Sequence, residues 1–216
     1  MNKIKMRLLR AAAFAAVLFA AAAAPVVGEP VQIVALGDSL TAGLGVAPGE
    51  SFPEQLQAAL VARGHDVTVT NAGVSGDTAS DGMARLEWSV PAEADIVIVE
   101  LGANDSLRGI DPAVTRKALS GILAKLRERG QTALLAGMLA PRNLGEEFAA
   151  EFDAIYPELA AEYGTALYPF FLAGVATERT LNQPDGMHPN SEGVAKLVEA
   201  MLPLVEELVS EAAADR

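Results

Sequence analysis

Residues 95–101 read DIVIVEL, and this nearly unbroken apolar run decides the fold class. Consecutive apolar side chains over such a short length are typical of a strand that is buried on both faces of a parallel sheet. Residues 31–36 (VQIVAL) form a second run of this kind, which Gly37 ends. We predict three further strands, of which the last has the weakest pattern, at 66–70, 132–138 and 166–170.

Helical patterns separate these strands. Residues 51–63 place apolar side chains at helical spacing, and Gly64 follows them. By the same criteria we predict helices at 79–88, 112–129, 146–163 and 191–213. Pro157 lies inside the helix predicted at 146–163, where a proline can kink the chain. Strands that alternate with helices predict a parallel sheet covered on both faces, with right-handed crossovers.

The first 28 residues have the pattern of a signal peptide. Four basic residues precede an uninterrupted apolar run of 14 residues at 11–24. A membrane-spanning helix needs about 20 residues, whereas this run has the size of a signal-peptide core. We expect cleavage between Ala24 and Pro30, which leaves a single domain at 29–216. The expected location is the periplasm; full secretion and an uncleaved N-terminal anchor are the alternatives.

The composition limits the classes of partner. The chain has 16 Lys and Arg against 28 Asp and Glu, and loss of residues 1–28 removes four positive charges and gives a net charge of −16. Nucleic-acid binding needs a basic surface and is therefore excluded. The chain has no cysteine, which excludes disulfides, thiolate metal sites and a cysteine nucleophile. We expect a monomer that acts on a small molecule, without stable membrane insertion of the mature chain.

Polar residues gather in the segments after the predicted strands, at the edge where open parallel sheets bind ligands. These segments read GDSLTAG at 37–43, NAGVSGD at 71–77 and GAND at 102–105, and DGMHP follows at 185–189. Acyl transfer to a serine requires a base, a group that orients the base, and donors for the oxyanion. The sequence holds candidates for each of these parts.

The chain has only two histidines, so few residues can serve as the base. His65 lies in a helix-to-strand turn at the opposite end of the predicted sheet, and we expect it to be an exposed turn residue. His188 follows Asp185 by three residues, so that the aspartate can orient the imidazole while His188 reaches Ser39. We therefore predict Ser39 as nucleophile, His188 as base and Asp185 as its orienting partner, without a metal or an organic cofactor.

Four blocks, in order along residues 31–210, resemble those of the SGNH, or GDSL-type, esterase family: GDSL at 37–40, Gly73, GAND at 102–105 and DGMH at 185–188. The bacterial periplasmic branch with arylesterase, thioesterase I and lysophospholipase L1 activities is the most similar. The family's third block usually has glycine where this chain has Ala103.

The resemblance implies a flavodoxin-like α/β/α fold, a five-stranded parallel sheet of order 2-1-3-4-5, and hydrolysis of carboxylic esters and thioesters. It also implies an oxyanion hole formed by the backbone N–H groups of Ser39 and Gly73 and the side chain of Asn104. Lysophospholipids are further candidate substrates.

Two apolar or flexible segments on the same side as these loops are candidates for an acyl groove. They contribute Leu44, Val46, Met138, Leu139 and Leu144. Met138 and Leu139 have an alternative interpretation as the buried end of a strand. The functional alternatives are a carbohydrate O-deacetylase of the same family, which would share these blocks, and a non-catalytic flavodoxin-like binding module.

Overall fold

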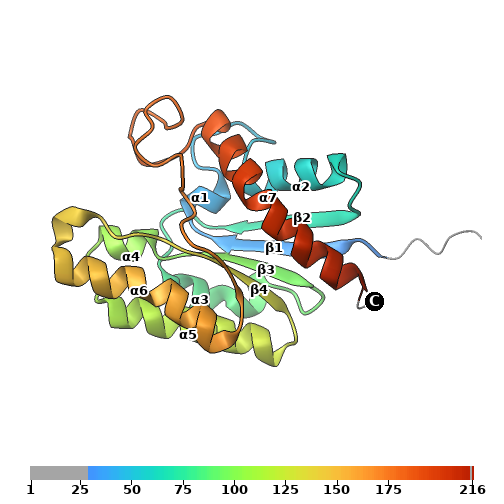
Figure 1. The fold of residues 1–216 in the computed structure, drawn as a ribbon, viewed down its shortest axis with the longest axis horizontal. Helices are drawn as coiled ribbons and strands as arrows, with labels where there is room; N and C mark the ends of the chain where they lie inside the picture. Colours follow the sequence, from blue (N-terminus) through green and yellow to red (C-terminus); the bar gives the residue numbers. More distant parts are fainter. Residues whose placement is uncertain (1–28, 215) are drawn as a thin grey trace, which may run out of the picture.

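The computed structural model describes residues 29–214 and 216, so the predicted signal peptide at 1–28 lies outside the described residues. The described chain forms a single sheet with helices packed against both of its faces (Figure 1). Within residues 29–214 we find no helix with the length and hydropathy that a membrane span requires.

The sheet is parallel throughout and has the spatial order β2-β1-β3-β4-β5. β1 lies next to β2 and β3 and is buried along nearly all of its length. This order confirms the predicted flavodoxin-like α/β/α fold. The strands are β1 (Val31–Gly37), β2 (Val67–Gly73), β3 (Ile96–Glu100), β4 (Thr132–Ala136) and β5 (Ala166–Tyr168).

Within the described residues, five long helices form the two outer layers (Figure 1). One face carries α2 (Phe52–Ala62) and α7 (Ser191–Ala214), and the other carries α3 (Ala79–Ser89), α5 (Pro112–Glu128) and α6 (Glu146–Tyr163). Three short helices follow strand ends, namely α1 (Ser39–Ala42), α4 (Ala103–Leu107) and the 3-10 helix η1 (Arg142–Leu144).

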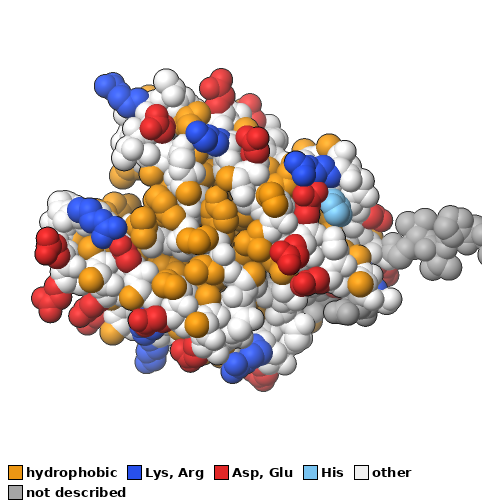
Figure 2. Space-filling view, in the orientation of Figure 1, with side chains coloured by type: hydrophobic (Ala, Val, Ile, Leu, Met, Phe, Trp, Pro, Cys, Tyr) orange, Lys and Arg blue, Asp and Glu red, His pale blue; other side chains and the backbone are white. Residues whose placement is uncertain are grey.

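Hydrophobic side chains reach the surface mainly in one region of the face drawn in Figure 2. They form a band across the middle of this face, between the lobe formed by the loop that precedes α7 and the lobe that carries α6. Acidic and basic side chains surround this band. The exposed apolar surface on this face is therefore concentrated rather than scattered.

The predicted strand boundaries differ from the observed ones mainly at the carboxyl ends. β2 continues to Gly73 instead of ending at residue 70, because 71–73 keep the parallel pairing with 35–37 of β1. As an edge strand β2 exposes polar side chains, so its sequence lacks the apolar run of an inner strand. β4 and β5 end two residues earlier than predicted, and α6 is continuous across Pro157.

Two glycines permit close backbone packing at the site end of the sheet. A Cβ at Gly73 would lie 2.3 Å from the backbone nitrogen of Ala42, so only glycine lets α1 lie against the end of β2. Gly102 precedes α4 with a φ of +115°, and a Cβ there would lie 2.2 Å from the Tyr156 hydroxyl. Both glycines therefore set the positions of short helices that carry predicted site residues.

Candidate active site

Ser39 lies at the first position of α1, two residues after the end of the inner strand β1. Asp38 caps this helix, since its Oδ1 accepts a hydrogen bond from the Leu40 N–H at 3.0 Å. The helix is only four residues long and ends at Gly43 in the left-handed conformation. Its N-terminal backbone N–H groups have no partners within the helix, which leaves the Ser39 N–H free to bind an anion.

The structure brings Ser39, His188 and Asp185 together in one chain of hydrogen bonds. Ser39 Oγ lies 2.9 Å from His188 Nε2, and His188 Nδ1 lies 2.7 Å from Asp185 Oδ2. Hydrogen bonds from the Met187 N–H and then from His188 lower the pKa of Asp185 to about 2. Asp185 is therefore a carboxylate at neutral pH and accepts a hydrogen bond from the Nδ1–H of His188, which leaves the Nε2 lone pair to face the serine hydroxyl.

A glutamine that sequence reasoning did not select connects the histidine loop to the serine helix. The Gln183 Nε2 donates to the backbone oxygen of Leu44 at 2.6 Å and to that of Pro189 at 2.9 Å. The Gln183 N–H donates to the His188 oxygen at 2.8 Å. Because the two loops are distant in sequence, only its place two residues before Asp185 could have indicated this role.

His65 lies before β2, at the opposite end of the parallel sheet from Ser39. Its Nε2 lies 3.2 Å from Glu206 Oε1 on α7, and its side chain is 25% exposed. The prediction of an exposed residue was therefore wrong, because the contact with α7 covers most of the ring. Its position in a turn remote from Ser39 agrees with the prediction.

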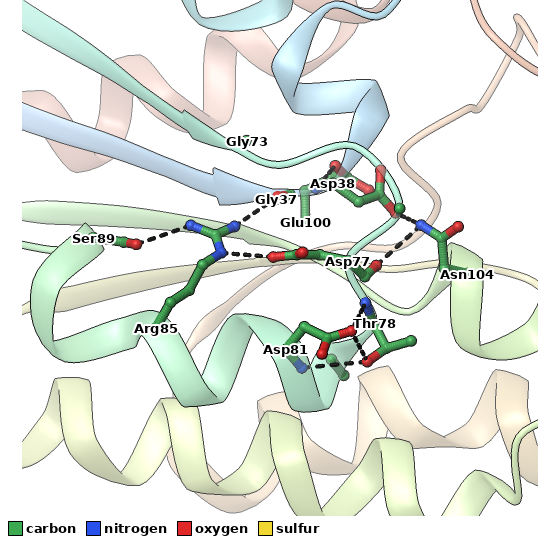
Figure 3. Close-up of polar contacts among 12 residues, drawn as sticks. Gly37, Asp38, Gly73, Asp77, Thr78, Asp81, Arg85, Ser89, Glu100 and Asn104 are labelled. Atoms are coloured by element: carbon green, nitrogen blue, oxygen red, sulfur yellow. Dashed lines mark hydrogen bonds and ion pairs between the residues drawn. The ribbon is translucent and has the colours of Figure 1, made fainter.

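Asn104 lies on α4 with its amide directed toward the loops after β1 and β2 (Figure 3). Its Nδ2 donates to Asp38 Oδ2 and to the backbone oxygen of Asp77, both at 3.0 Å. Both amide protons are thus engaged inside the protein. A substrate oxyanion would compete with Asp38 for one of them.

The third predicted donor, the Gly73 N–H, also has a partner. It donates to Asn71 Oδ1 of the same strand at 2.9 Å. Of the three predicted donors, the backbone N–H of Ser39 is therefore the one best placed to donate to a substrate oxygen without breaking an existing hydrogen bond.

Two buried carboxyl groups lie beside Ser39. Glu100 is fully buried at the end of β3, where its Oε2 accepts from Thr41 Oγ1 at 2.7 Å and from the Asp38 N–H at 3.3 Å. Its Oε1 has no hydrogen-bond partner within the described chain. Burial raises the pKa of Glu100 well above its ordinary value and raises the pKa of Asp38 to about 6. The sequence signal for Glu100 is an acid within the otherwise apolar strand at 95–101.

Asp105, next to Asn104, has a structural role. Its Oδ2 accepts from the Ala79 N–H at 2.8 Å, and its Oδ1 accepts from Thr115 Oγ1 at 2.9 Å. This buried side chain therefore joins α4 to the start of α3 and to α5.

A cavity of about 590 Å³ opens beside Ser39, Asn104 and His188. Two of the predicted groove residues, Met138 and Leu139, line it, whereas Leu44, Val46 and Leu144 do not. β4 ends at Ala136, so the alternative interpretation of Met138 and Leu139 as the buried end of a strand was wrong. Met138 is nevertheless buried, while Leu139 is 41% exposed. Further apolar lining residues are Leu107, Pro141, Phe170, Leu172 and Met187.

The sequence is also similar to proteins of a known family. Residues 35–196 match the model of the family described as GDSL-like Lipase/Acylhydrolase. An arylesterase of Vibrio mimicus is 38% identical over 169 residues, which cover 78% of this chain and 84% of that protein. Thioesterase 1/protease 1/lysophospholipase L1 of Escherichia coli (strain K12) is 35% identical over 179 residues, which cover 82% of this chain and 85% of that protein.

A solved structure is also similar. The crystal structure of AlinE4, described as an SGNH-hydrolase family esterase, has 48% sequence identity and a TM-score of 0.71. The match covers 83% of this chain and 97% of AlinE4.

The raised pKa of Glu100 predicts a pH-dependent contribution to stability. Folding favours the protonated acid, so this contribution is present below the ordinary pKa of 4.5 and is lost as pH rises toward the folded-state pKa. Glutamine does not titrate. Between pH 5 and 8 we expect wild type to lose stability relative to Glu100→Gln, by up to about 1.4 kcal/mol per pH unit, in urea unfolding experiments.

Glu54 provides the control, because hydrogen bonds from Ser51 lower its pKa. Its contribution is lost only as the pH falls, so the stability difference between wild type and Glu54→Gln should stay constant from pH 6 to 8. If the Glu100→Gln difference is equally constant, Glu100 titrates normally and the interpretation is wrong.

Proposed function

This chain belongs to the GDSL-like lipase/acylhydrolase family and is a serine ester hydrolase, and we propose that Ser39, His188 and Asp185 carry out its reaction. The observation that carries this proposal is the continuous path of hydrogen bonds from Ser39 Oγ through the imidazole to the Asp185 carboxylate. A non-catalytic binding module does not account for this path, and the named relatives are enzymes.

The reaction has two halves. Ser39 Oγ attacks the acyl carbon while His188 Nε2 takes its proton, and Asp185 stabilises the imidazolium that results. His188 then protonates the leaving alcohol or thiol as its bond to the acyl carbon breaks. Water, deprotonated by His188, attacks the acyl-serine and releases the acid and free Ser39.

The negative charge on the carbonyl oxygen is stabilised by donors that are already in place. The Ser39 N–H at the start of α1 is one donor, and Asn104 and the Gly73 N–H are the others. The Gly73 N–H exchanges its bond to Asn71 Oδ1 for a bond to the oxyanion. Asn104 gives up its bond to Asp38 as charge develops, so its contribution arises mainly in the transition state.

The proposed substrates are aryl esters and esters with short to medium acyl chains. The cavity beside Ser39 has an apolar lining and a volume of about 590 Å³, within the range of sites that hold one small molecule. Leu139, Phe170 and Leu172 present apolar side chains to it, which favours an acyl chain over a sugar. Acyl thioesters and lysophospholipids are included because the relative from Escherichia coli is named for those activities.

We further propose that residues 1–28 direct export and are removed, so that residues 29–216 form a single-domain periplasmic enzyme. The basic start and the apolar run at 11–24 support this proposal. The net charge of −16 on the remaining chain supports a monomer, because like charges repel.

Replacement of the two histidines separates the base from the remote residue. His188→Ala should lower kcat for p-nitrophenyl acetate by about 10³-fold or more, because Ser39 loses its base. His65→Ala should leave kcat within about twofold of wild type, since the His65 side chain pairs with Glu206 of α7 at the far end of the sheet. Equal losses in both variants, with circular dichroism showing folded protein, would contradict the assignment.

A substrate series tests the acyl-chain assignment. We expect kcat/KM for p-nitrophenyl esters to rise from acetate to a medium-chain ester, because burial of each methylene contributes about 0.8 kcal/mol. Acetylated xylose, a lysophospholipid and an acyl thioester are assayed in parallel. A highest kcat/KM for the acetylated sugar would instead identify a carbohydrate O-deacetylase.

A further inference from the structure

An arginine outside the proposed mechanism connects two of the loops that build the site. We propose that Arg85 is a positioning residue for catalysis, which fixes Asn104 relative to Ser39 by holding the end of β1 and the 74–78 loop together. The proposal rests on the proposed function, because it gives Arg85 a role only if Asn104 stabilises an oxyanion formed at Ser39.

The Arg85 guanidinium contacts three different parts of the chain (Figure 3). Its Nε lies 2.6 Å from Asp77 Oδ2, its Nη2 donates to the backbone oxygen of Gly37 at 2.9 Å, and its Nη1 donates to Ser89 Oγ at 3.0 Å. The side chain is only 7% exposed. Because the guanidinium is planar and rigid, these bonds fix the spacing of the groups that they join.

Two of these groups, the backbone oxygen of Gly37 and the Asp77 carboxylate, belong to segments that position site residues. Gly37 is the last residue of β1 and stands two residues before Ser39. Its backbone oxygen also accepts the Val74 N–H at 3.0 Å, so the 74–78 loop is attached to the end of β1 at the same atom. The Arg85 bond to Gly37 therefore attaches α3 to the end of β1, the strand that precedes Ser39.

The second group, Asp77, also contacts Asn104. The Asp77 carboxylate pairs with Arg85, while the Asp77 backbone oxygen accepts one amide proton of Asn104 at 3.0 Å (Figure 3). This bond and the bond to Asp38 Oδ2 set the orientation of the Asn104 amide. A shift of the Asp77 backbone therefore moves the donor that is proposed to meet the oxyanion.

The cost of this arrangement argues for a positioning role. The Asp77 side chain in the pair is only 13% exposed, and a buried ion pair pays a desolvation penalty that often cancels its attraction. A buried ion pair of this kind is therefore weak evidence for a role in stability alone. A site of this kind depends strongly on geometry, because a misplacement of about 1 Å can cost about 10²-fold in rate.

Arg85→Lys tests the role while the positive charge is kept. A lysine ammonium can pair with Asp77, but it lacks the planar fork that also holds Gly37 and Ser89. We expect kcat for p-nitrophenyl acetate to fall by about 10- to 100-fold, with KM within about twofold of wild type.

Arg129→Lys is the matched control. Arg129 is 17% exposed, pairs with Glu87 at the far end of α3 and donates to the Val90 backbone oxygen at 3.2 Å. It has no contact with the site loops, so both kcat and KM should stay within about twofold of wild type. Circular dichroism and thermal melts confirm that both variants fold.

A double-mutant cycle with Asn104→Ala distinguishes positioning from general support of the fold. Asn104→Ala alone should lower kcat by about 10²–10³-fold. If Arg85 acts through Asn104, Arg85→Lys should lower kcat by less than about twofold in that background, because the donor that Arg85 positions is already absent. If Arg85→Lys does not fold, Asp77→Glu replaces it in the cycle, since it keeps the ion pair but moves the Asp77 backbone, and the same result is expected.

Two results would overturn the proposal: a folded Arg85→Lys with the kcat of wild type, or the same fold-loss with and without Asn104. Ser39→Ala, measured in parallel, separates this failure from failure of the proposed function. An inactive Ser39→Ala beside a fully active Arg85→Lys refutes only the role of Arg85, whereas an active Ser39→Ala refutes the proposed function itself.

Discussion

The site depends on the register of three parallel strands at their carboxyl ends. Gly37 of β1 pairs with Gly73 of β2 on one side and with Glu100 of β3 on the other. The three strands therefore end at the same level, and the segments that follow them meet in one small volume. The absence of a Cβ at Gly73 then lets α1 lie against β2, which places Ser39 among these segments.

This convergence buries polar groups that must find partners within the protein. Asp38 accepts a hydrogen bond from Asn104, and Asp77 contacts both Asn104 and Arg85. Glu100 accepts a hydrogen bond from Thr41 of α1. Charges in such an environment interact strongly because little water screens them. Asp77, Arg85 and Glu100, which do not line the cavity, therefore hold the groups that the proposed chemistry uses at Ser39.

Sequence patterns predicted strands well where the strand is buried on both faces of the sheet. They predicted the edge strand, which is partly exposed, less well. The apolar run at 95–101 identified an inner strand, whereas the polar edge strand β2 was cut short by three residues. Spacing in the 185–188 loop predicted a contact between Asp185 and His188 because the two residues are close in sequence. Contacts between distant elements, such as Arg85 with Gly37, leave no local pattern. For the same reason Leu44, Val46 and Leu144 were predicted at a groove that they do not line, although residues 138–142 of the segment that contains Leu144 do line it.

The central claim is that Ser39 forms a covalent bond to the acyl group, and trapping this serine tests it most directly. Wild type and Ser39→Ala are treated with a p-nitrophenyl alkylphosphonate, which leaves a stable adduct on an activated serine, and are digested for peptide mass spectrometry. The account predicts a single adduct on the peptide that contains Ser39, with parallel loss of esterase activity, and no adduct in Ser39→Ala. An adduct on a different residue, or full inactivation of wild type with Ser39 unmodified, would contradict it.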